Sequence, residues 1–133
     1  RAAGADALLL IAAILADSEL EKLLSRTEEL GMAALIEVHD ADEMERVIQF
    51  SPDLIGVNNR DLHNFSVDIR TSQRLRSMAP KDVCYVAESG IHSWQDVETL
   101  YHCAVDAVLV GEALVTAENI GEKVRELSAY DLD

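Results

Sequence analysis

Gly-Val-Asn-Asn-Arg-Asp-Leu, at residues 56–62, marks the point where an apolar run of the chain gives way to polar side chains. The run itself, Leu54–Val57, is typical of a buried parallel strand, and the amides and arginine that follow it are typical of a functional loop. The same change occurs where other apolar runs end, at Glu37, at Asn58 and Arg60, at Glu88–Gly90, and at Gly111 and Glu112. Because successive parallel strands of an α/β barrel end on one face, the sequence predicts that these polar groups gather there.

Units with the same order follow one another along the chain: an apolar run, a polar junction and an amphipathic segment with helical period. The runs expected to form strands are Asp6–Ile11, Ala33–Val38, Leu54–Asn58, Val83–Ala87 and Ala107–Val110. The segments expected to form helices begin near residues 17, 41, 68, 93, 112 and 118, and the last of them extends to Tyr130. Parallel strands joined by right-handed helical crossovers satisfy this alternation.

Two of the expected helices carry N-terminal capping signals. Asp17 or Ser18 is a suitable N-cap for the first long helix, and Glu21 is placed to complete a capping box. Ser93 is a suitable N-cap for a later helix, with Asp96 three residues further on.

Five parallel strands fit either an open doubly wound sheet or most of a (β/α)8 barrel. A dinucleotide-binding Rossmann sheet would carry Gly-x-Gly-x-x-Gly after its first strand, and the sequence lacks that motif. Polar residues at many strand ends favour the barrel instead. No linker rich in Pro, Gly or Ser divides the chain. We therefore expect a single α/β domain over residues 1–133, a partial (β/α)8 TIM barrel of five parallel strands with flanking helices.

The composition narrows the classes of partner. The chain has 133 residues, of which 49% are hydrophobic, and this is enough for one core. Its formal net charge of −14 argues against a nucleic acid or an anionic membrane as a partner, because phosphate groups require a basic surface. No apolar stretch reaches the roughly 18 residues of a membrane-spanning helix.

Metal and redox sites are not expected from the cysteines and histidines. Cys84 and Cys103 belong to no Cys-x-x-Cys motif. The histidines show no paired ligand spacing; they are His39, His63, His92 and His102. We therefore expect a structural or surface role for each histidine, and neither a metal nor a cofactor.

Several segments, taken together, resemble one enzyme family. They are residues 4–11 (Gly-Ala-Asp-Ala-Leu-Leu-Leu-Ile), 35–40 (Leu-Ile-Glu-Val-His-Asp), 55–62 (Ile-Gly-Val-Asn-Asn-Arg-Asp-Leu), 88–91 (Glu-Ser-Gly-Ile) and 108–114 (Val-Leu-Val-Gly-Glu-Ala-Leu). In order and spacing the chain resembles indole-3-glycerol phosphate synthase, a (β/α)8 enzyme of tryptophan biosynthesis. The Asn-Asn-Arg-Asp segment is the most specific of these matches.

The resemblance implies a reaction and a set of site residues. The family is a cytoplasmic, cofactor-free carboxy-lyase that converts 1-(2-carboxyphenylamino)-1-deoxyribulose 5-phosphate to indole-3-glycerol phosphate, carbon dioxide and water. The positions that match its catalytic residues are Glu37, Asn58 and Glu88. The positions that match its substrate-binding residues are Arg60, Ser89 and Leu109, the last of them lining a pocket for the aromatic ring. The resemblance also implies that backbone N–H groups bind the phosphate at Gly90, Gly111 and Glu112. The side chain of Glu112 would point away from it.

The side chains themselves suit such chemistry, and each also has a structural alternative. Glu37 ends an apolar run, and burial would raise the pKa of its carboxyl group as acid–base work requires, unless a neighbour pairs with it. Arg60 offers a fixed cationic fork for a carboxylate or phosphate, or else forms an ion pair with Asp61 or a helix acid. Asn58 can hold a hydroxyl group or cap its own loop. Ser89 can hydrogen-bond the substrate or cap a helix.

The resemblance also implies that the chain carries the last five strand-helix units of the barrel and lacks two lysines that the family uses. We expect the chain alone to be inactive, and to associate with the missing amino-terminal segment or with itself through open sheet edges. Two alternatives remain open: a related isomerase or epimerase of sugar phosphates, and a non-catalytic half-barrel assembly module.

Overall fold

The computed structural model describes residues 2–62 and 64–128, which form a set of strands with helices between them. The strands are β1 (Ala7–Ile11), β2 (Ala33–Val38), β3 (Leu54–Asn58), β4 (Cys84–Glu88) and β5 (Ala107–Leu109). The helices are η1 (Ala12–Ile14), α1 (Asp17–Glu29), α2 (Ala41–Val47), η2 (Ile48–Phe50), α3 (Arg70–Arg76), α4 (Trp94–Tyr101), α5 (Glu112–Val115) and α6 (Ile120–Ser128), where η denotes a 3-10 helix. His63 and the expected helix end at Tyr130 lie outside the described residues.

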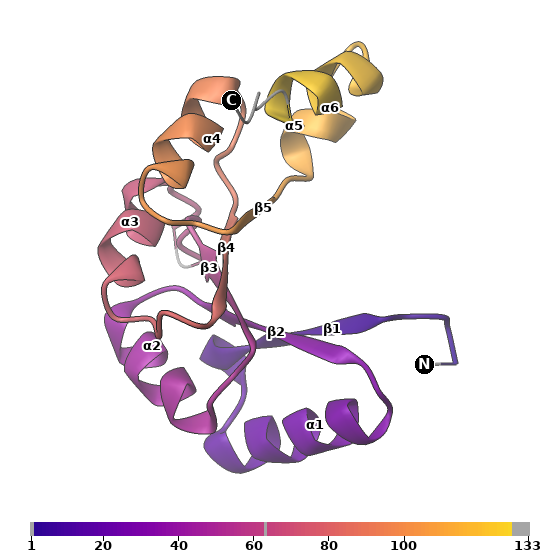
Figure 1. The fold of residues 1–133 in the computed structure, drawn as a ribbon, viewed down its shortest axis with the longest axis vertical. Helices are drawn as coiled ribbons and strands as arrows, with labels where there is room; N and C mark the ends of the chain where they lie inside the picture. The colour runs from indigo at the N-terminus through magenta and orange to yellow at the C-terminus, as the bar shows by residue number, and fades with distance from the viewer. Residues whose placement is uncertain (1, 63, 129–133) are drawn as a thin grey trace.

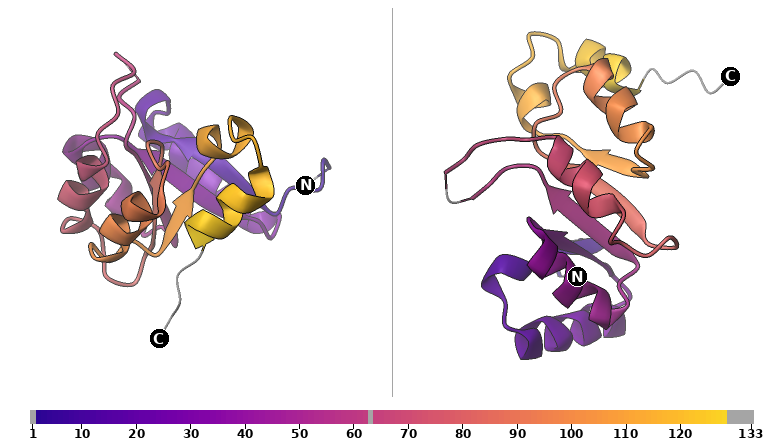
Figure 2. Two further views of the ribbon diagram at one scale, coloured as in Figure 1. Left: turned by 90° about the horizontal axis from the view of Figure 1, so that it is seen from above. Right: turned by 90° about the vertical axis from the view of Figure 1, so that its left-hand side faces the viewer.

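The strands all pair in parallel, in the order β1-β2-β3-β4-β5. Figure 1 shows the sheet as an arc with α1, α2, α3 and α4 along its outer side, and the right-hand view of Figure 2 faces that helical side. The expected α/β fold is confirmed: parallel strands with flanking helices, curved as part of a barrel. Within the described ranges, every helix is too short or too polar to span a lipid bilayer.

The main core lies between the outer side of the sheet and the helices. Alternate strand residues point to this side, and among them are Leu10, Ile36, Val38, Ile55, Val57, Tyr85 and Ala87. The Tyr85 hydroxyl group donates to the backbone oxygen of Ser72 on α3 at 2.8 Å, which satisfies the one polar atom of this ring. Full burial of a large aliphatic side chain stabilises a fold by about 1.5–3 kcal/mol, so this layer holds the helices to the sheet.

The other alternate residues face the inner side of the arc. The register pairs Glu37 with Gly56 across β2 and β3, and it pairs Asn58 with Glu88 across β3 and β4. Glu88 pairs in turn with Leu109 on β5. Polar strand ends therefore occupy neighbouring positions on the side of the sheet that the helices do not cover.

The N-terminus of α1 differs from the sequence prediction. Asp17 is already helical, and Ala16, which has an extended backbone, is the N-cap in place of Asp17 or Ser18. Glu19, not Glu21, supplies the capping carboxylate, and its Oε2 accepts the Ala16 N–H at 3.0 Å. The prediction was wrong because alanine has no side-chain acceptor, so the usual signal pointed to its polar neighbours.

The other capping prediction is confirmed. Ser93 is the N-cap of α4, and Asp96 Oδ2 accepts the Ser93 N–H at 2.9 Å. The helix α3 begins two residues later than expected, at Arg70, because Asp68 Oδ1 accepts the Arg70 N–H at 3.0 Å and forms a turn before the helix.

Asn59 ties the loop after β3 to two neighbouring elements. The residue is 2% exposed, and its Nδ2 donates to the Ser89 carbonyl oxygen at 3.1 Å. Its Oδ1 accepts both the N–H and the hydroxyl group of Ser72 on α3, at 3.0 and 2.8 Å. The side chain thus joins the end of β4 to the start of α3, and sequence reasoning did not assign it any role.

We expect Asn59→Ala to lower the free energy of unfolding by about 2–4 kcal/mol, because several buried polar groups lose their partner at once. Urea unfolding of the chain measures this loss. Asn64→Ala is the matched control, since the Asn64 side chain makes its hydrogen bonds to Asp61 and Ser66 at exposed positions. Its loss should stay below about 1 kcal/mol, and equal losses for the two variants would contradict the structural role of Asn59.

Candidate active site

Two carboxyl groups meet on the inner side of the sheet. Glu37 at the end of β2 is 5% exposed, and Glu88 at the end of β4 is 4% exposed. Strand β3 lies between them and carries Gly56 at this point, where a Cβ atom would overlap Glu88 Oε1. The absence of a side chain at Gly56 therefore allows the Glu88 carboxyl group to lie across β3 against Glu37.

This position changes the acidity of Glu88. Burial raises the pKa of the Glu88 carboxyl group from 4.5 to about 7, and the nearby charge of Glu37 acts in the same direction. Glu88 Oε1 has no hydrogen-bond partner among the described residues. A carboxyl group with a pKa near neutrality can both give and accept a proton at pH 7, as acid–base catalysis requires.

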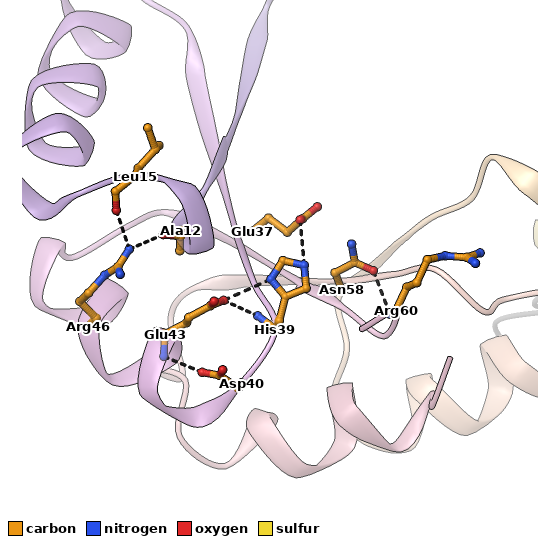
Figure 3. A network of polar contacts seen from close by, with 9 residues as sticks. All are labelled: Ala12, Leu15, Glu37, His39, Asp40, Glu43, Arg46, Asn58 and Arg60. Atoms are coloured by element: carbon orange, nitrogen blue, oxygen red, sulfur yellow. Dashed lines mark hydrogen bonds and ion pairs between the residues drawn. The ribbon is translucent and has the colours of Figure 1, made fainter. Parts of the chain in front are cut away.

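His39 connects Glu37 to the helix α2. Its Nε2 lies 3.2 Å from Glu37 Oε1, and its Nδ1 lies 3.2 Å from Glu43 Oε2. The backbone N–H of His39 donates to the same Glu43 oxygen at 2.7 Å. Figure 3 shows the imidazole ring between the two carboxylates. Sequence reasoning gave His39 only a structural or surface role and did not place it at the site.

His39 and Glu43 also line a pocket of about 560 Å3 between the loops that follow β2 and β3. Other polar side chains that line it are Asp40, Asn58, Asn59, Asp61, Ser66, Asp68, Thr71 and Arg74. The pocket therefore lies beside the carboxyl pair, toward α2 and α3.

Arg60 reaches across the strand ends to α5. Its Nη2 donates to Glu112 Oε2 at 2.6 Å, with the Arg60 side chain 30% and the Glu112 side chain 60% exposed. Asn58 Oδ1 accepts the Arg60 N–H at 3.0 Å and fixes the loop locally. The expectation that the Glu112 side chain points away was wrong, because the guanidinium group of Arg60 attracts it.

A smaller pocket, of about 200 Å3, lies where β4 and β5 end. It is lined by Arg60, Ser89, Gly90, Gly111 and Glu112, among others. Ser89 and Gly90 have φ angles of 66° and 76°, and a Cβ at Gly90 would also overlap a side chain of the loop after β3, so turn geometry explains that glycine. Gly111 has an ordinary φ of −119°, and a Cβ there would meet nothing within 4 Å.

Leu109 completes the inner row on β5. It is 52% exposed, beside Glu88 in the register, and it offers an apolar surface at the strand ends. Within residues 2–62 and 64–128, no group of three or more His, Cys, Asp and Glu side chains is arranged to hold a metal ion.

A further pocket, of about 670 Å3, lies at the opposite ends of the strands. It is lined by α1 and by residues 49–54, and it shares no residue with the carboxyl pair. Sequence reasoning missed two residues that shape the site, His39 and Gly56. A glycine inside an apolar strand is a known sign of close approach by another group, and this signal could have identified Gly56.

We expect Glu88→Gln to change how stability depends on pH. The folded-state pKa of Glu88, about 7, lies above its ordinary value of 4.5, so the folded state binds this proton more tightly and loses stability as pH rises between these values. The loss approaches about 3 kcal/mol at most. Glutamine removes it, so the stability of the variant relative to the parent chain should rise between about pH 4.5 and about pH 7 and stay constant above that.

Urea unfolding at several pH values measures this difference. Glu98→Gln is the control, since Glu98 is exposed on α4. A pH dependence for Glu88→Gln that parallels the parent chain would refute the raised pKa.

We expect Gly56→Ala to separate the two carboxyl groups, because the added methyl group occupies the space of Glu88 Oε1. Overpacking at this point should lower the free energy of unfolding by about 1–3 kcal/mol and reduce its fall with rising pH. Gly121→Ala in α6 is the control, since its Cβ would approach no atom closer than 3.5 Å. That variant should be neutral or more stable, because alanine favours a helix.

The amino-acid sequence matches one known family along most of its length. A sequence model described as indole-3-glycerol phosphate synthase matches residues 1–127. A protein of that name from Roseiflexus sp. strain RS-1 is 50% identical over 129 residues, which are 96% of this chain and 48% of that protein. Another from Dehalococcoides mccartyi is 47% identical over 124 residues, which are 93% of this chain and 48% of that protein. The chain thus spans about half the length of these curated relatives.

Solved structures support the fold. The structure of 3-hexulose-6-phosphate synthase from Salmonella typhimurium superposes with a TM-score of 0.82 and 18% sequence identity, covering 96% of this chain and 62% of that one. At this identity the likeness shows the shared fold alone. The family is shown instead by the sequence model, which matches most of this chain, and by the 47% and 50% identity to members of the family. On these grounds, the chain belongs to the indole-3-glycerol phosphate synthase family.

Proposed function

We propose that this chain supplies part of the active site of an enzyme that converts 1-(2-carboxyphenylamino)-1-deoxyribulose 5-phosphate to indole-3-glycerol phosphate, carbon dioxide and water in tryptophan biosynthesis. The observation that carries the proposal is the buried pair of carboxyl groups, Glu37 and Glu88, at the inner strand ends. Membership of the family supports the choice of reaction.

The carboxyl pair suits both halves of the proton chemistry. Ring closure protonates the sugar oxygen that leaves as water, and a carbon next to it loses a proton as the indole forms. Near neutral pH the pair shares one proton, because burial and Glu37 raise the pKa of Glu88 to about 7. One member can then act as the acid while the other acts as the base.

Polar residues next to the pair would orient the substrate. Arg60 would bind a carboxylate or phosphate oxygen in place of Glu112, with which it forms an exposed ion pair. The amide group of Asn58 would hold a hydroxyl group, and the Ser89 hydroxyl group would bind the substrate beside it. Leu109, apolar and half exposed, would contact the aromatic ring.

The smaller pocket would receive the phosphate group. It is bordered by the backbone at Gly90, Gly111 and Glu112. Packing does not explain Gly111, because a Cβ there would meet nothing within 4 Å. Close approach of a ligand to its backbone gives this glycine a physical reason.

The lysines that the family uses would come from outside this chain. Lys22 lies on α1, Lys81 on the turn before β4, and Lys123 on α6, so none of them is at the carboxyl end of a strand. We infer that the chain alone is inactive. Among the described residues β1 and β5 pair along one edge only, and these edges would pair with the rest of a barrel, or with a second copy when that part is missing.

The experiment joins this chain to the part of the Roseiflexus relative that it does not match, and follows formation of indole-3-glycerol phosphate. The joined protein should be active, and the chain alone should not be. Glu37→Gln and Glu88→Gln should each lower kcat by about 100-fold or more, because each removes a group that transfers protons.

Glu98→Gln serves as the control and should leave kcat unchanged, because this side chain is exposed on α4 and lines neither pocket at the strand ends. Full activity of both site variants would overturn the proposal. Turnover of a ketose phosphate that lacks the anthranilate group would favour a sugar-phosphate isomerase or epimerase instead, and no turnover by the joined protein would favour a non-catalytic module.

A further inference from the structure

The imidazole ring of His39 lies between carboxyl groups that belong to opposite sides of the sheet. Its Nε2 is 3.2 Å from Glu37 Oε1 on the inner side, and its Nδ1 is 3.2 Å from Glu43 Oε2 on the outer helix α2. The His39, Glu37 and Glu43 side chains are only 13%, 6% and 16% exposed. The ring therefore lies at the end of β2 between the two carboxyl groups, as Figure 3 shows.

The contacts of Glu43, His39 and Glu37 indicate which of their atoms carry protons. Glu43 Oε2 accepts the backbone N–H of His39 at 2.7 Å, so this oxygen acts as an acceptor. His39 Nδ1 lies beside the same oxygen and is therefore the nitrogen that carries a proton. The remaining contact, between Nε2 and Glu37 Oε1, is an ion-pair distance of 3.2 Å, and Nε2 makes no hydrogen bond among the described residues. Two bare acceptors at this distance repel, so the contact is favourable only when one more proton lies on the carboxyl group or on the ring.

Hydrogen bonds fix the position of Glu43 next to the ring. It lies in the first turn of α2, where its backbone N–H donates to Asp40 Oδ1 at 2.9 Å. Its negative charge stabilises a positive charge on the ring, since the two groups are in contact and largely removed from water. The order Glu43, His39, Glu37 thus matches the arrangement in which a carboxylate orients a histidine and stabilises its protonated form.

We propose that His39 is a positioning residue that holds a proton for Glu37, with Glu43 fixing the ring and balancing its charge. In this step the O–H bond of the Glu37 carboxyl group breaks and an N–H bond forms at His39 Nε2. The products are a Glu37 carboxylate and an imidazolium ring between two carboxylates. The reverse step returns the proton to Glu37, so atoms and charge balance in both directions.

This inference rests on the proposed function, in which one turnover requires both a donor and an acceptor of protons at the same buried pair. Glu37 can act as a base once His39 has taken its proton, and as an acid once the proton returns. Glu37 and Glu88 alone share one proton, and His39 provides a third place for it.

Other charged groups lie farther from the ring than Glu37 and Glu43 do. Glu88 lies beyond Glu37 across β3, and Asp40 caps α2. Arg46, one turn further along α2, points away from the ring and donates to the Leu15 carbonyl oxygen at 3.1 Å. The charged side chains that share the pocket with His39 and Glu43 are Asp40, Asp61, Asp68 and Arg74.

The decisive variant in the joined enzyme is His39→Gln. Glutamine keeps an amide donor near the position of Nε2 and can preserve the orientation of Glu37, but it cannot hold a proton. We expect kcat to fall about tenfold, KM to change less than about twofold, and the pH profile of kcat to change shape. Glu43→Gln should act in the same direction, because it removes the charge that stabilises the imidazolium ring.

Chemical rescue provides a second measurement. His39→Ala removes the ring beside a pocket of about 560 Å3, which has room for free imidazole. We expect added imidazole to restore kcat in proportion to its concentration. His102→Gln is the control, since His102 is exposed at the C-cap of α4, and it should be unaffected.

A parental pH profile in His39→Gln, or failure of imidazole to rescue His39→Ala, would overturn the proposal. A third measurement needs no activity. Nitrogen NMR of the chain alone should show the His39 proton on Nδ1 at about pH 7, and a bare Nδ1 would equally overturn it. If the joined parent enzyme makes no product, the proposed function fails, and the NMR result still decides the arrangement of protons around His39.

Discussion

The contact between Glu88 and Glu37, made over the backbone of Gly56, is the constraint on which the rest of the site depends. Adjacent buried carboxyl groups are unfavourable when both are ionised, so the pair retains a proton at pH values where an exposed carboxyl group has lost it. The sheet imposes this arrangement, because the parallel register brings the ends of β2 and β4 to either side of β3. Asn58 is the next residue of β3 on the same side, so the polar loop begins directly above the carboxyl pair.

The strands could be predicted from sequence because each is an apolar run that ends at a polar group, and each observed bound lies within one residue of the expected one. The residues that shape the site were harder to predict from sequence, since their roles depend on contacts with other elements. In the sequence Gly56 is one more residue of an apolar run, and only the sheet shows that the Glu88 side chain lies against it. Asn58 and Asn59 are adjacent amides, and only the end of β3 decides that Asn59 turns toward Ser72 on the helical side while Asn58 faces the site.

In the proposed function, the ion pair between Arg60 and Glu112 would hold the guanidinium group in place until an anionic group of the substrate binds. Both side chains are partly exposed, so the pair contributes only about 0–1 kcal/mol to stability. A phosphate or carboxylate group that offers two oxygens can replace Glu112 at little cost, because the fork of Arg60 binds such groups at two points. Glu112 thus keeps the guanidinium group across the strand ends, at the border of the pocket that contains Gly111.

In the role that we propose, His39 would separate proton storage from substrate binding. Glu37, Asn58 and Glu88 face the inner side of the sheet, whereas Glu43 belongs to a helix on the outer side. A ring at the end of β2, between Glu37 and Glu43, would hold a proton for Glu37 at the wall of the pocket that Asn58 also lines. The same placement explains why sequence spacing did not reveal the role of His39. His39 and Glu43 meet because α2 begins shortly after β2 ends. Glu37 meets the ring because it is the last residue of β2 that faces the inner side. The turn from β2 to α2, rather than either element alone, therefore brings Glu37, His39 and Glu43 into contact.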